Sequence, residues 1–273
     1  MKNILLIDKQ AGWTSFDVVA KIRNAVNQIN KNQGLPKTKH GVKVGHAGTL
    51  DPFATGLLIV LVGKETTAKQ EMFMKQDKEY QATLRLGFTS STGDPEGDIT
   101  SFIPLASLVP ESSSGQTPAQ GSILSSEGDP RVRKDDKPFL EDIEGVLQTF
   151  LGEIEQIPPI YSAIKIDGKR AYKLARAGEK VVMKPRLVNI LKLKIDKYAY
   201  PELRVTVKCS SGTYIRSLAE DIGKTLGCGA YLTELRRTKI GHYSIADAVT
   251  VEAALKTLVN PLNNAPDCSI IDA

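Results

Sequence analysis

One segment of the sequence places an acidic side chain where it could act on a substrate. Residues 45–58 read Gly-His-Ala-Gly-Thr-Leu-Asp-Pro-Phe-Ala-Thr-Gly-Leu-Leu. The three glycines and the proline favour tight turns with positive φ angles over a regular helix or strand. An apolar run over 57–62 follows at once and predicts a buried strand or helix that anchors the turn. Asp51 is therefore expected to act on a bound molecule or, in the alternative, to cap a turn beside Pro52.

Arg216 is a second residue whose position calls for an explanation. An alternating, strand-like stretch over 203–209 runs into a small-residue turn, and a helix is expected over 215–226. This places Arg216 in the first helical turn, where the helix dipole disfavours a cation by about 0.5 kcal/mol. We therefore expect Arg216 to have an anionic partner.

The elements that must position these two residues follow from periodicity and turn signals. The pattern predicts strands over 3–7, 79–87, 162–166, 186–195, 203–209 and 231–238, the last with exposed arginines. It predicts helices over 16–29, 66–75, 139–150, 171–177, 215–226 and 251–258. Thr14 and Asp17 have the spacing of a capping box for the first helix. Tyr80 lies on the apolar face of its strand, so packing is its default role.

Two stretches are expected to be loops. Residues 90–98 form a turn rich in glycine and serine whose acidic residues lack the spacing of a calcium-binding loop. Residues 106–138 are dense in serine, glycine and proline and poor in aliphatic residues. Such a composition does not repay the entropy lost on ordering, so we expect a disordered insertion there.

Charge is distributed in a way that fits a polyanionic partner. The 273 residues carry a net charge of +5, with ordinary apolar content. Residues 21–44 contain six Lys or Arg and no acid, and residues 165–186 contain eight basic residues against two acids. The two blocks would form one phosphate-binding face if the fold brings them together. The alternative is a pair of solvated helix faces.

Several function classes lose support. The cysteines and histidines show no metal-site or disulfide spacing (Cys209, Cys228, Cys268, His40, His46 and His242). No Walker A motif, complete dinucleotide-binding fingerprint or nucleophile elbow is present, so we expect neither a cofactor nor a metal. The N-terminus does not resemble a signal peptide, and no apolar run is long enough for a membrane span. A cytoplasmic protein without contact to a membrane is expected.

Several blocks, in the same order along the chain, resemble the TruB family of tRNA pseudouridine synthases. They are Leu5-Leu6-Ile7-Asp8-Lys9 with Gly12-Trp13-Thr14-Ser15, the 45–58 turn, Tyr80, Tyr161-Ser162-Ala163-Ile164-Lys165, and Gly212-Thr213-Tyr214-Ile215-Arg216 with Leu235-Arg236-Arg237. The Gly-His-x-Gly-x-Leu-Asp-Pro-x-Ala-x-Gly pattern is highly specific. The resemblance implies an α+β fold with a mixed, largely antiparallel sheet flanked by helices and a central RNA-binding cleft.

The resemblance also assigns roles to residues. It implies that Asp51 is the catalytic nucleophile and that Arg216 is its partner. It implies that Tyr80 stacks on the target base, which overrides the packing role expected above. His46 would support the opened T-loop. The positions lining the uridine pocket would be Tyr214 and Leu235.

The implied activity is the isomerisation of uridine to pseudouridine at position 55, in the T-loop of tRNA, by a flipped base and an Asp nucleophile. The partner would be the T-loop and T-stem of tRNA, with no obligatory protein partner and a monomeric enzyme. We expect a catalytic domain over 1–250 and, over 251–273, a short helix and tail without a complete C-terminal RNA-binding module. The alternative is a non-catalytic tRNA-binding or tRNA-folding protein on the same scaffold. The order of attack, on sugar or on base, stays open.

Overall fold

The computed structural model describes residues 4–34, 41–102, 137–162, 164–166, 168–179 and 181–259. Of the expected insertion at 106–138, only residues 137 and 138 fall within these ranges, and the tail from residue 260 lies outside them. Within the described ranges no helix has the length and hydropathy that crossing a membrane requires.

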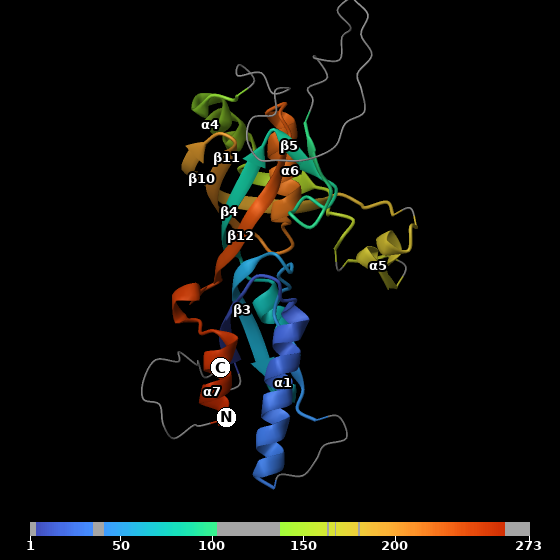
Figure 1. The fold of residues 1–273 in the computed structure, drawn as a ribbon, viewed down its shortest axis with the longest axis vertical. Helices are drawn as coiled ribbons and strands as arrows, with labels where there is room; N and C mark the ends of the chain where they lie inside the picture. Colours follow the sequence, from blue (N-terminus) through green and yellow to red (C-terminus); the bar gives the residue numbers. More distant parts are fainter. Residues whose placement is uncertain are drawn as a thin grey trace, which may run out of the picture.

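Helices separate groups of one to three consecutive strands along the chain (Figure 1). The strands are β1 (Ile4–Lys9), β2 (Val44–His46), β3 (Thr55–Val62), β4 (Lys78–Leu86), β5 (Phe88–Ser90), β6 (Ile99–Ser101), β7 (Gly152–Gln156), β8 (Lys165–Ile166), β9 (Lys169–Arg170), β10 (Arg186–Ala199), β11 (Glu202–Cys209), β12 (Ala230–Ile240) and β13 (Tyr243–Ser244). The helices are α1 (Ser15–Asn32), α2 (Lys64–Ala68), α3 (Gln70–Met74), α4 (Leu140–Thr149), α5 (Ala171–Arg176), α6 (Ile215–Thr225) and α7 (Val251–Val259), with a 3-10 turn at Ile245–Asp247.

One large sheet organises the molecule. Its strand order is β1-β3-β12-β4-β11-β10-β7, with β13 added to β12 and β2 added to β3. The β3–β12 pair is parallel, and the other pairs in this sheet are antiparallel. The expectation of a mixed, largely antiparallel sheet flanked by helices is confirmed.

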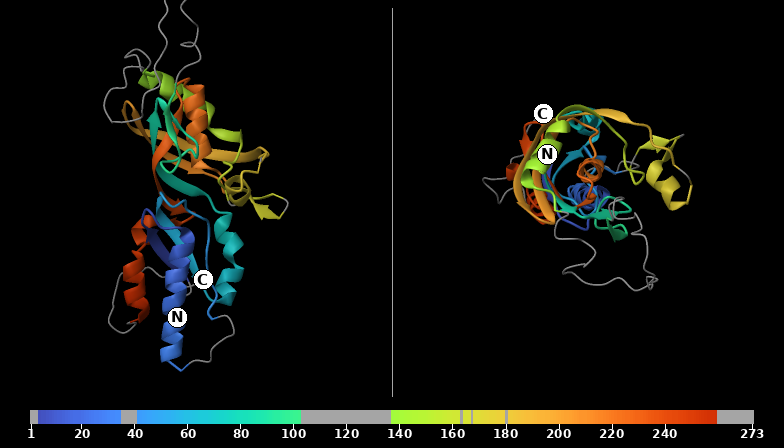
Figure 2. Two further views of the ribbon diagram at one scale, coloured as in Figure 1. Left: turned by 45° about the vertical axis from the view of Figure 1, so that its right-hand side comes forward. Right: turned by 90° about the horizontal axis from the view of Figure 1, so that it is seen from above.

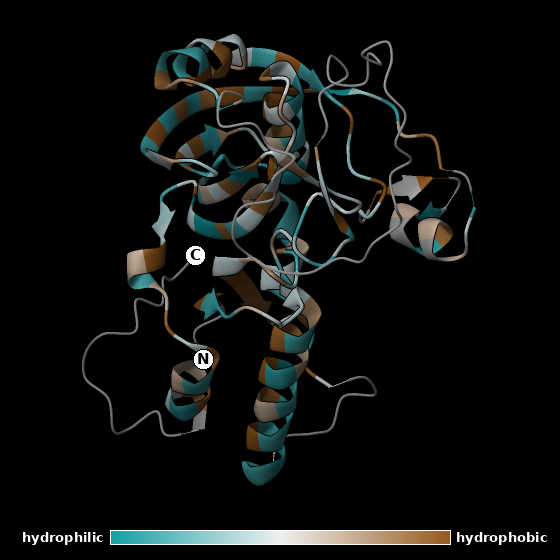
Figure 3. Cartoon of the chain, turned by 45° about the horizontal axis from the view of Figure 1, so that its top comes forward, coloured by the Kyte–Doolittle hydropathy of each residue, from teal (hydrophilic) through white to brown (hydrophobic). Residues whose placement is uncertain are grey.

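The helices cover the sheet in two groups (Figures 1 and 2). Helices α4 and α6 pack on β4, β10, β11 and β12. Helices α1 and α7 pack on one face of β1 and β3, while Phe73 of α3 packs on the other face. Because β1 and β3 are buried on both faces, β3 is apolar from Leu57 to Val62, whereas β10 and β11 alternate between apolar and polar residues (Figure 3).

Helix α1 begins as the sequence predicts. The Thr14 Oγ1 accepts a hydrogen bond from the Asp17 N–H at 3.1 Å, and Asp17 Oδ2 accepts one from the Thr14 N–H at 2.9 Å. This confirms the capping box, a motif in which each cap bond contributes about 1 kcal/mol. The helix buries Val18, Ile22 and Val26 against the sheet.

Three sequence-based expectations need correction. The helix expected over 66–75 is two short helices, α2 and α3, that meet at Lys69. The strand expected over 162–166 is reduced to β8, which forms a short hairpin with β9. The arginines of β12 are not both exposed: Arg236 is 40% exposed, but Arg237 is only 1% exposed. Arg237 is buried because β12 is a central strand, between β3 and β4, a placement that local sequence does not reveal.

Candidate active site

The Asp51 turn connects β2 to β3, which pair antiparallel, so the buried anchor predicted after Asp51 is a strand. Two of the turn's glycines have positive φ angles, 99° at Gly48 and 103° at Gly56. A Cβ on Gly56 would lie 2.3 Å from the carbonyl oxygen of Arg237, which is far inside van der Waals contact. Glycine at position 56 is therefore required both by backbone conformation and by the close approach of β12.

Two buried polar side chains fasten the turn from outside it. The Ser15 Oγ, at the start of α1, donates to the Leu50 carbonyl at 3.1 Å and accepts from the Leu50 N–H at 2.8 Å. The fully buried Lys9 Nζ donates to the Pro52 carbonyl at 3.2 Å and to the Trp13 carbonyl at 2.7 Å. Burial lowers the pKa of Lys9 to about 8. Both residues lie within blocks that carry the family resemblance, but no local sequence signal indicated a role for them in the site.

Arg216 has the anionic partner that its place in the first turn of α6 required. Its Nε lies 3.1 Å from Asp51 Oδ2, and its Nη2 donates to Asp51 Oδ1 at 3.4 Å. The guanidinium is 5% exposed, while 35% of the Asp51 side chain remains open to solvent. Such a two-pronged pair fixes the direction of the carboxylate as well as its charge. The structure thus brings together two residues that are 165 positions apart.

Asp94 is a site residue that the sequence analysis missed. Arg216 Nη1 donates to Asp94 Oδ2 at 3.0 Å and to the Thr92 carbonyl at 3.0 Å. The Asp94 carboxylate is itself buried, and its Oδ1 accepts from the Thr92 hydroxyl at 2.5 Å and from the Glu96 N–H at 3.0 Å. The loop over 90–98 is therefore a structural support for Arg216. The position of Arg216 in a first helical turn indicated an anionic partner, but the sequence did not show that two carboxylates, Asp51 and Asp94, bind it.

The charges around Asp51 act in opposite directions on its pKa. Burial raises the pKa of Asp51, and the Arg216 guanidinium lowers it. Asp94 raises this pKa further, whereas Lys9 and Arg237 lower it. The net result is a pKa above the usual value of an Asp, and the three cations limit the rise that burial and Asp94 cause.

Tyr80 and Leu235 lie on the neighbouring central strands β4 and β12. Both are nearly fully buried and share one hydrophobic cluster with Leu50 and Ala54, which flank Asp51 in the turn. Burial raises the pKa of the Tyr80 phenol. The structure therefore places both residues beside the Asp51 turn, with Tyr80 packed as its strand pattern indicates.

Tyr214 directly precedes α6 and is held by its backbone. The buried Gln156 donates from Nε2 to the Tyr214 carbonyl at 3.0 Å and accepts at Oε1 from the Tyr214 N–H at 2.7 Å. Burial raises the pKa of the Tyr214 phenol, and both Asp51 and Arg216 act on it electrostatically. Tyr214 therefore belongs to the same site as the Asp51–Arg216 pair.

His46 is set apart from that pair. It ends β2, and among the described interactions none joins it to Asp51 or Arg216. Burial lowers the pKa of its ring, and Arg237 lowers it further. Its Nδ1 is buried without a hydrogen-bond partner. His46 thus lies at the far end of the turn, five residues before Asp51.

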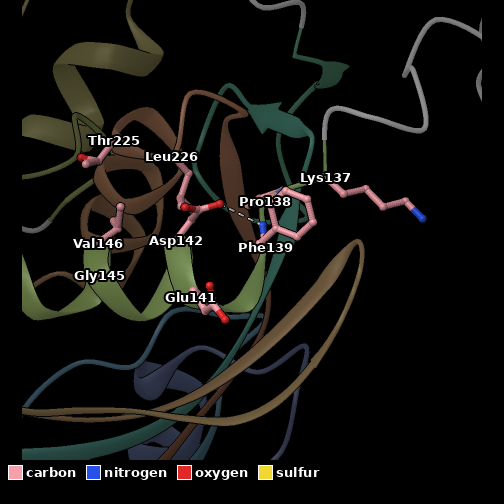
Figure 4. A pocket seen from close by; sticks show the side chains of 9 residues that line it. All are labelled: Lys137, Pro138, Phe139, Glu141, Asp142, Gly145, Val146, Thr225 and Leu226. Atoms are coloured by element: carbon pink, nitrogen blue, oxygen red, sulfur yellow. Dashed lines mark hydrogen bonds between the residues drawn. The ribbon is translucent and has the colours of Figure 1, made fainter.

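A surface pocket lies elsewhere on the molecule, between the start of α4 and the end of α6 (Figure 4). It is lined by Lys137, Pro138, Phe139, Glu141, Asp142, Gly145, Val146, Thr225 and Leu226. Arg216 is in the first turn of the 11-residue helix α6, so this pocket is about 15 Å from it along the helix axis. Across the described residues, no group of three or more His, Cys, Asp or Glu is arranged to hold a metal ion.

Comparison with known proteins agrees with this fold. Residues 35–114 and 115–215 match the N-terminal domain of the TruB family pseudouridylate synthases. Residues 216–266 match the tRNA pseudouridylate synthase B C-terminal domain. The fold is similar to a chain in the crystal structure of a Cbf5–Nop10–Gar1 complex, with a TM-score of 0.59 and 25% identity. That match covers 95% of this chain and 55% of the other.

Curated relatives match over nearly their whole length. A tRNA pseudouridine synthase B from Phocaeicola vulgatus is 41% identical over 250 residues, covering 92% of this chain and 90% of the relative. The enzyme of the same name from Opitutus terrae is 37% identical over 254 residues, with 93% and 87% covered. Fold and site together define a pseudouridine synthase, an isomerase that converts uridine to pseudouridine. The chain belongs to the TruB family.

The Asp94 carboxylate gives a first prediction. Replacing Asp94 by alanine is expected to lower kcat about 10- to 100-fold, because Arg216 loses a partner that holds its guanidinium against Asp51. KM for RNA should stay within about twofold, since most RNA affinity comes from phosphate contacts. Steady-state kinetics of Asp94→Ala and of the shape-conserving Asp94→Asn measure this. Equal and unchanged kcat values in both variants would contradict the role given to Asp94.

Proposed function

We propose that this enzyme converts the T-loop uridine at position 55 of tRNA to pseudouridine, with Asp51 as the nucleophile. The observation that carries the proposal is the buried Arg216 that bridges Asp51 and Asp94. A carboxylate that is both partly open to solvent and held ionised by a fixed cation is suited to nucleophilic attack. Relatives named tRNA pseudouridine synthase B support tRNA as the substrate. This substrate places the reaction in the cytoplasm.

The proposed reaction is an isomerisation that balances within one nucleoside. The target base leaves its stack in the loop, which costs about 3 kcal/mol. Stacking on Tyr80 offsets part of that cost. Asp51 attacks the nucleoside, the N1–C1′ bond breaks, and the base rotates. The C5–C1′ bond then forms and the bond between Asp51 and the nucleoside breaks, which regenerates the carboxylate. C5 loses its proton to solvent, and N1 takes up one proton from solvent in the product. Tyr214 and Leu235 line the pocket that holds the base during these steps.

The affinity for RNA is proposed to come from the two basic blocks, residues 21–44 and 165–186. Lys43, at the end of the first block, lies three residues before His46 in the chain. Arg170, from the second block, acts electrostatically on the His46 ring. On this proposal the two blocks, far apart in sequence, face the same end of the Asp51 turn. A positively charged surface around His46 would hold the phosphates of the opened T-loop.

We propose that the catalytic unit spans residues 1–250, with 251–273 as a short addition. Helix α7 starts this addition and contributes Val251 and Ala254 to the core shared with α1. The first part of the addition therefore supports the catalytic unit.

The function is tested with an unmodified tRNA transcript. The protein alone, without added cofactor, should form one pseudouridine per tRNA, at position 55, mapped by carbodiimide labelling and primer extension. A transcript with cytidine at position 55 is the matched control and should gain no pseudouridine. Tight binding of the tRNA without any conversion would instead favour the non-catalytic alternative. Conversion at another uridine would contradict the proposed position.

A further inference from the structure

Arg237 occupies the centre of the site's framework. On β12 it lies opposite Tyr80 of β4 on one side and opposite Gly56 of β3 on the other. It is 1% exposed, and its side chain lies on the same strand face as Leu235, two residues before it. The neighbouring Arg236 faces the other way and forms an ion pair with Asp8 at 2.7 Å. The two adjacent arginines therefore have different environments.

The Arg237 guanidinium binds the Asp51 turn on both sides of Asp51. Its Nη2 donates to the Gly48 carbonyl at 3.0 Å, and its Nη1 reaches the Thr49 carbonyl at 3.4 Å. Its Nε donates to the carbonyl of Leu57, which lies in β3 after Asp51, at 2.8 Å. In the part of the chain that the structure describes, no carboxylate forms an ion pair with it. A buried cation held by carbonyl oxygens alone is costly unless several hydrogen bonds compensate its lost hydration.

Arg237 and Tyr80 are directly paired across the β12–β4 ladder. The same residue therefore connects the turn that carries the nucleophile with the strand that carries the residue on which the base is proposed to stack.

We propose that Arg237 is a positioning residue that holds the Asp51 turn in a fixed place against β12, whose neighbour β4 carries Tyr80. This inference rests on the proposed function. Reacting groups must be held to within a fraction of an ångström, and a 1 Å error costs on the order of 10²-fold in rate. Arg237 meets this need because its planar fork binds carbonyl oxygens before and after Asp51 at once, a geometry that the ammonium group of a lysine does not reproduce.

The charge of Arg237 has a second consequence. The charged groups that act on the Asp51 carboxylate come from four places: Arg216 on α6, Asp94 in the β5–β6 loop, Lys9 on β1 and Arg237 on β12. Arg237 is one of the three that lower the pKa of Asp51. Loss of the Arg237 charge raises the pKa of Asp51. When the pH is lowered, the Asp51 carboxylate of the variant therefore becomes protonated at a higher pH than that of the wild type. The acid limb of the kcat profile should then move upward.

The test compares Arg237→Lys, Arg237→Gln and the neighbouring control Arg236→Gln. Both Arg237 variants should lose at least about tenfold in kcat, with KM for tRNA within about twofold of the wild type. Only Arg237→Gln, which loses the charge, should shift the acid limb of kcat to higher pH. Arg236→Gln should keep kcat within about twofold and leave the acid limb unchanged, because its main partner is Asp8 on β1, its contact with the Thr55 hydroxyl is long at 3.4 Å, and it is not among the charges that act on Asp51.

Thermal unfolding of each variant separates positioning from loss of fold. Arg237→Lys, folded at the assay temperature and yet slow, supports the proposal even if Arg237→Gln does not fold. A wild-type kcat in folded Arg237→Lys would overturn the proposal. So would a decrease in kcat that is fully accounted for by the decrease in the folded fraction of the variant at the assay temperature. Wild-type enzyme that leaves the T-loop uridine unchanged would instead contradict the proposed function.

Discussion

Replacing Asp51 by asparagine is expected to abolish pseudouridine formation. The amide has nearly the same shape as the carboxylate but carries no charge and does not act as a nucleophile. We expect kcat to fall by about 10⁴-fold or more, the scale on which losing a nucleophile acts in enzymes. A single-turnover assay with excess enzyme measures this directly, because it reports the chemical step without product release.

RNA binding should survive the Asp51→Asn change. Phosphate contacts supply most of the affinity, so Kd for tRNA should stay within about threefold. The fold should survive as well, because Arg216 keeps Asp94 at 3.0 Å and the Tyr161 carbonyl at 2.8 Å as partners. Filter binding and a thermal melt provide these two controls. If folded Asp51→Asn converted tRNA at more than about a hundredth of the wild-type rate, Asp51 would not be the nucleophile.

Replacing Arg216 by glutamine is expected to have the second largest effect. The change removes the cation between Asp51 and Asp94 and leaves two carboxylates facing each other. Since Arg216 lowers the pKa of Asp51, its loss raises that pKa beyond the elevation that burial already causes. At neutral pH a smaller fraction of Asp51 is then ionised. We expect kcat to fall about 10²- to 10³-fold, in the range seen when a fixed electrostatic group is removed from an active site.

The pH dependence gives this second prediction its sign. Because the carboxylate is the reactive form, activity is lost as the pH falls through the pKa of Asp51. A higher pKa in Arg216→Gln moves the acid limb of kcat to higher pH, and part of the lost activity returns as the pH is raised. A pH profile between about 5 and 9 measures the shift. An unmoved acid limb in a folded variant would show that Arg216 does not set the charge of Asp51.

Stability is the necessary control for the Arg216 variant. Breaking a buried ion pair by removing one partner costs about 3–5 kcal/mol, so Arg216→Gln should unfold at a lower temperature. The double variant Arg216→Gln with Asp94→Asn removes one of the uncompensated carboxylates. It should recover part of the lost stability without recovering activity. Urea unfolding of the single and double variants separates the stability effect from the catalytic one.

The local sequence indicated most of the longer helices and strands, and it singled out Asp51 and Arg216 as two residues in need of a role. Glycine, proline and a following apolar run predict a rigid turn that presents Asp51, because these residue types restrict the backbone locally. The Thr14 and Asp17 spacing predicts the start of α1 for the same reason. The place of Arg216 in a first helical turn requires an anion whatever the rest of the fold is. Each of these inferences depends only on residues within a turn or two of one another.

Tertiary structure alone decided which distant groups meet. Asp94 reaches Arg216 across 122 positions, and it lies in a loop whose composition resembles any acidic turn. Arg237 is buried because β12 lies between β3 and β4, a strand order that no local pattern encodes. The need for glycine at position 56 likewise comes from the β12 backbone at Arg237, 181 residues further along. Sequence determined the chemical groups available, and the long-range pairing of strands decided which of them share one site.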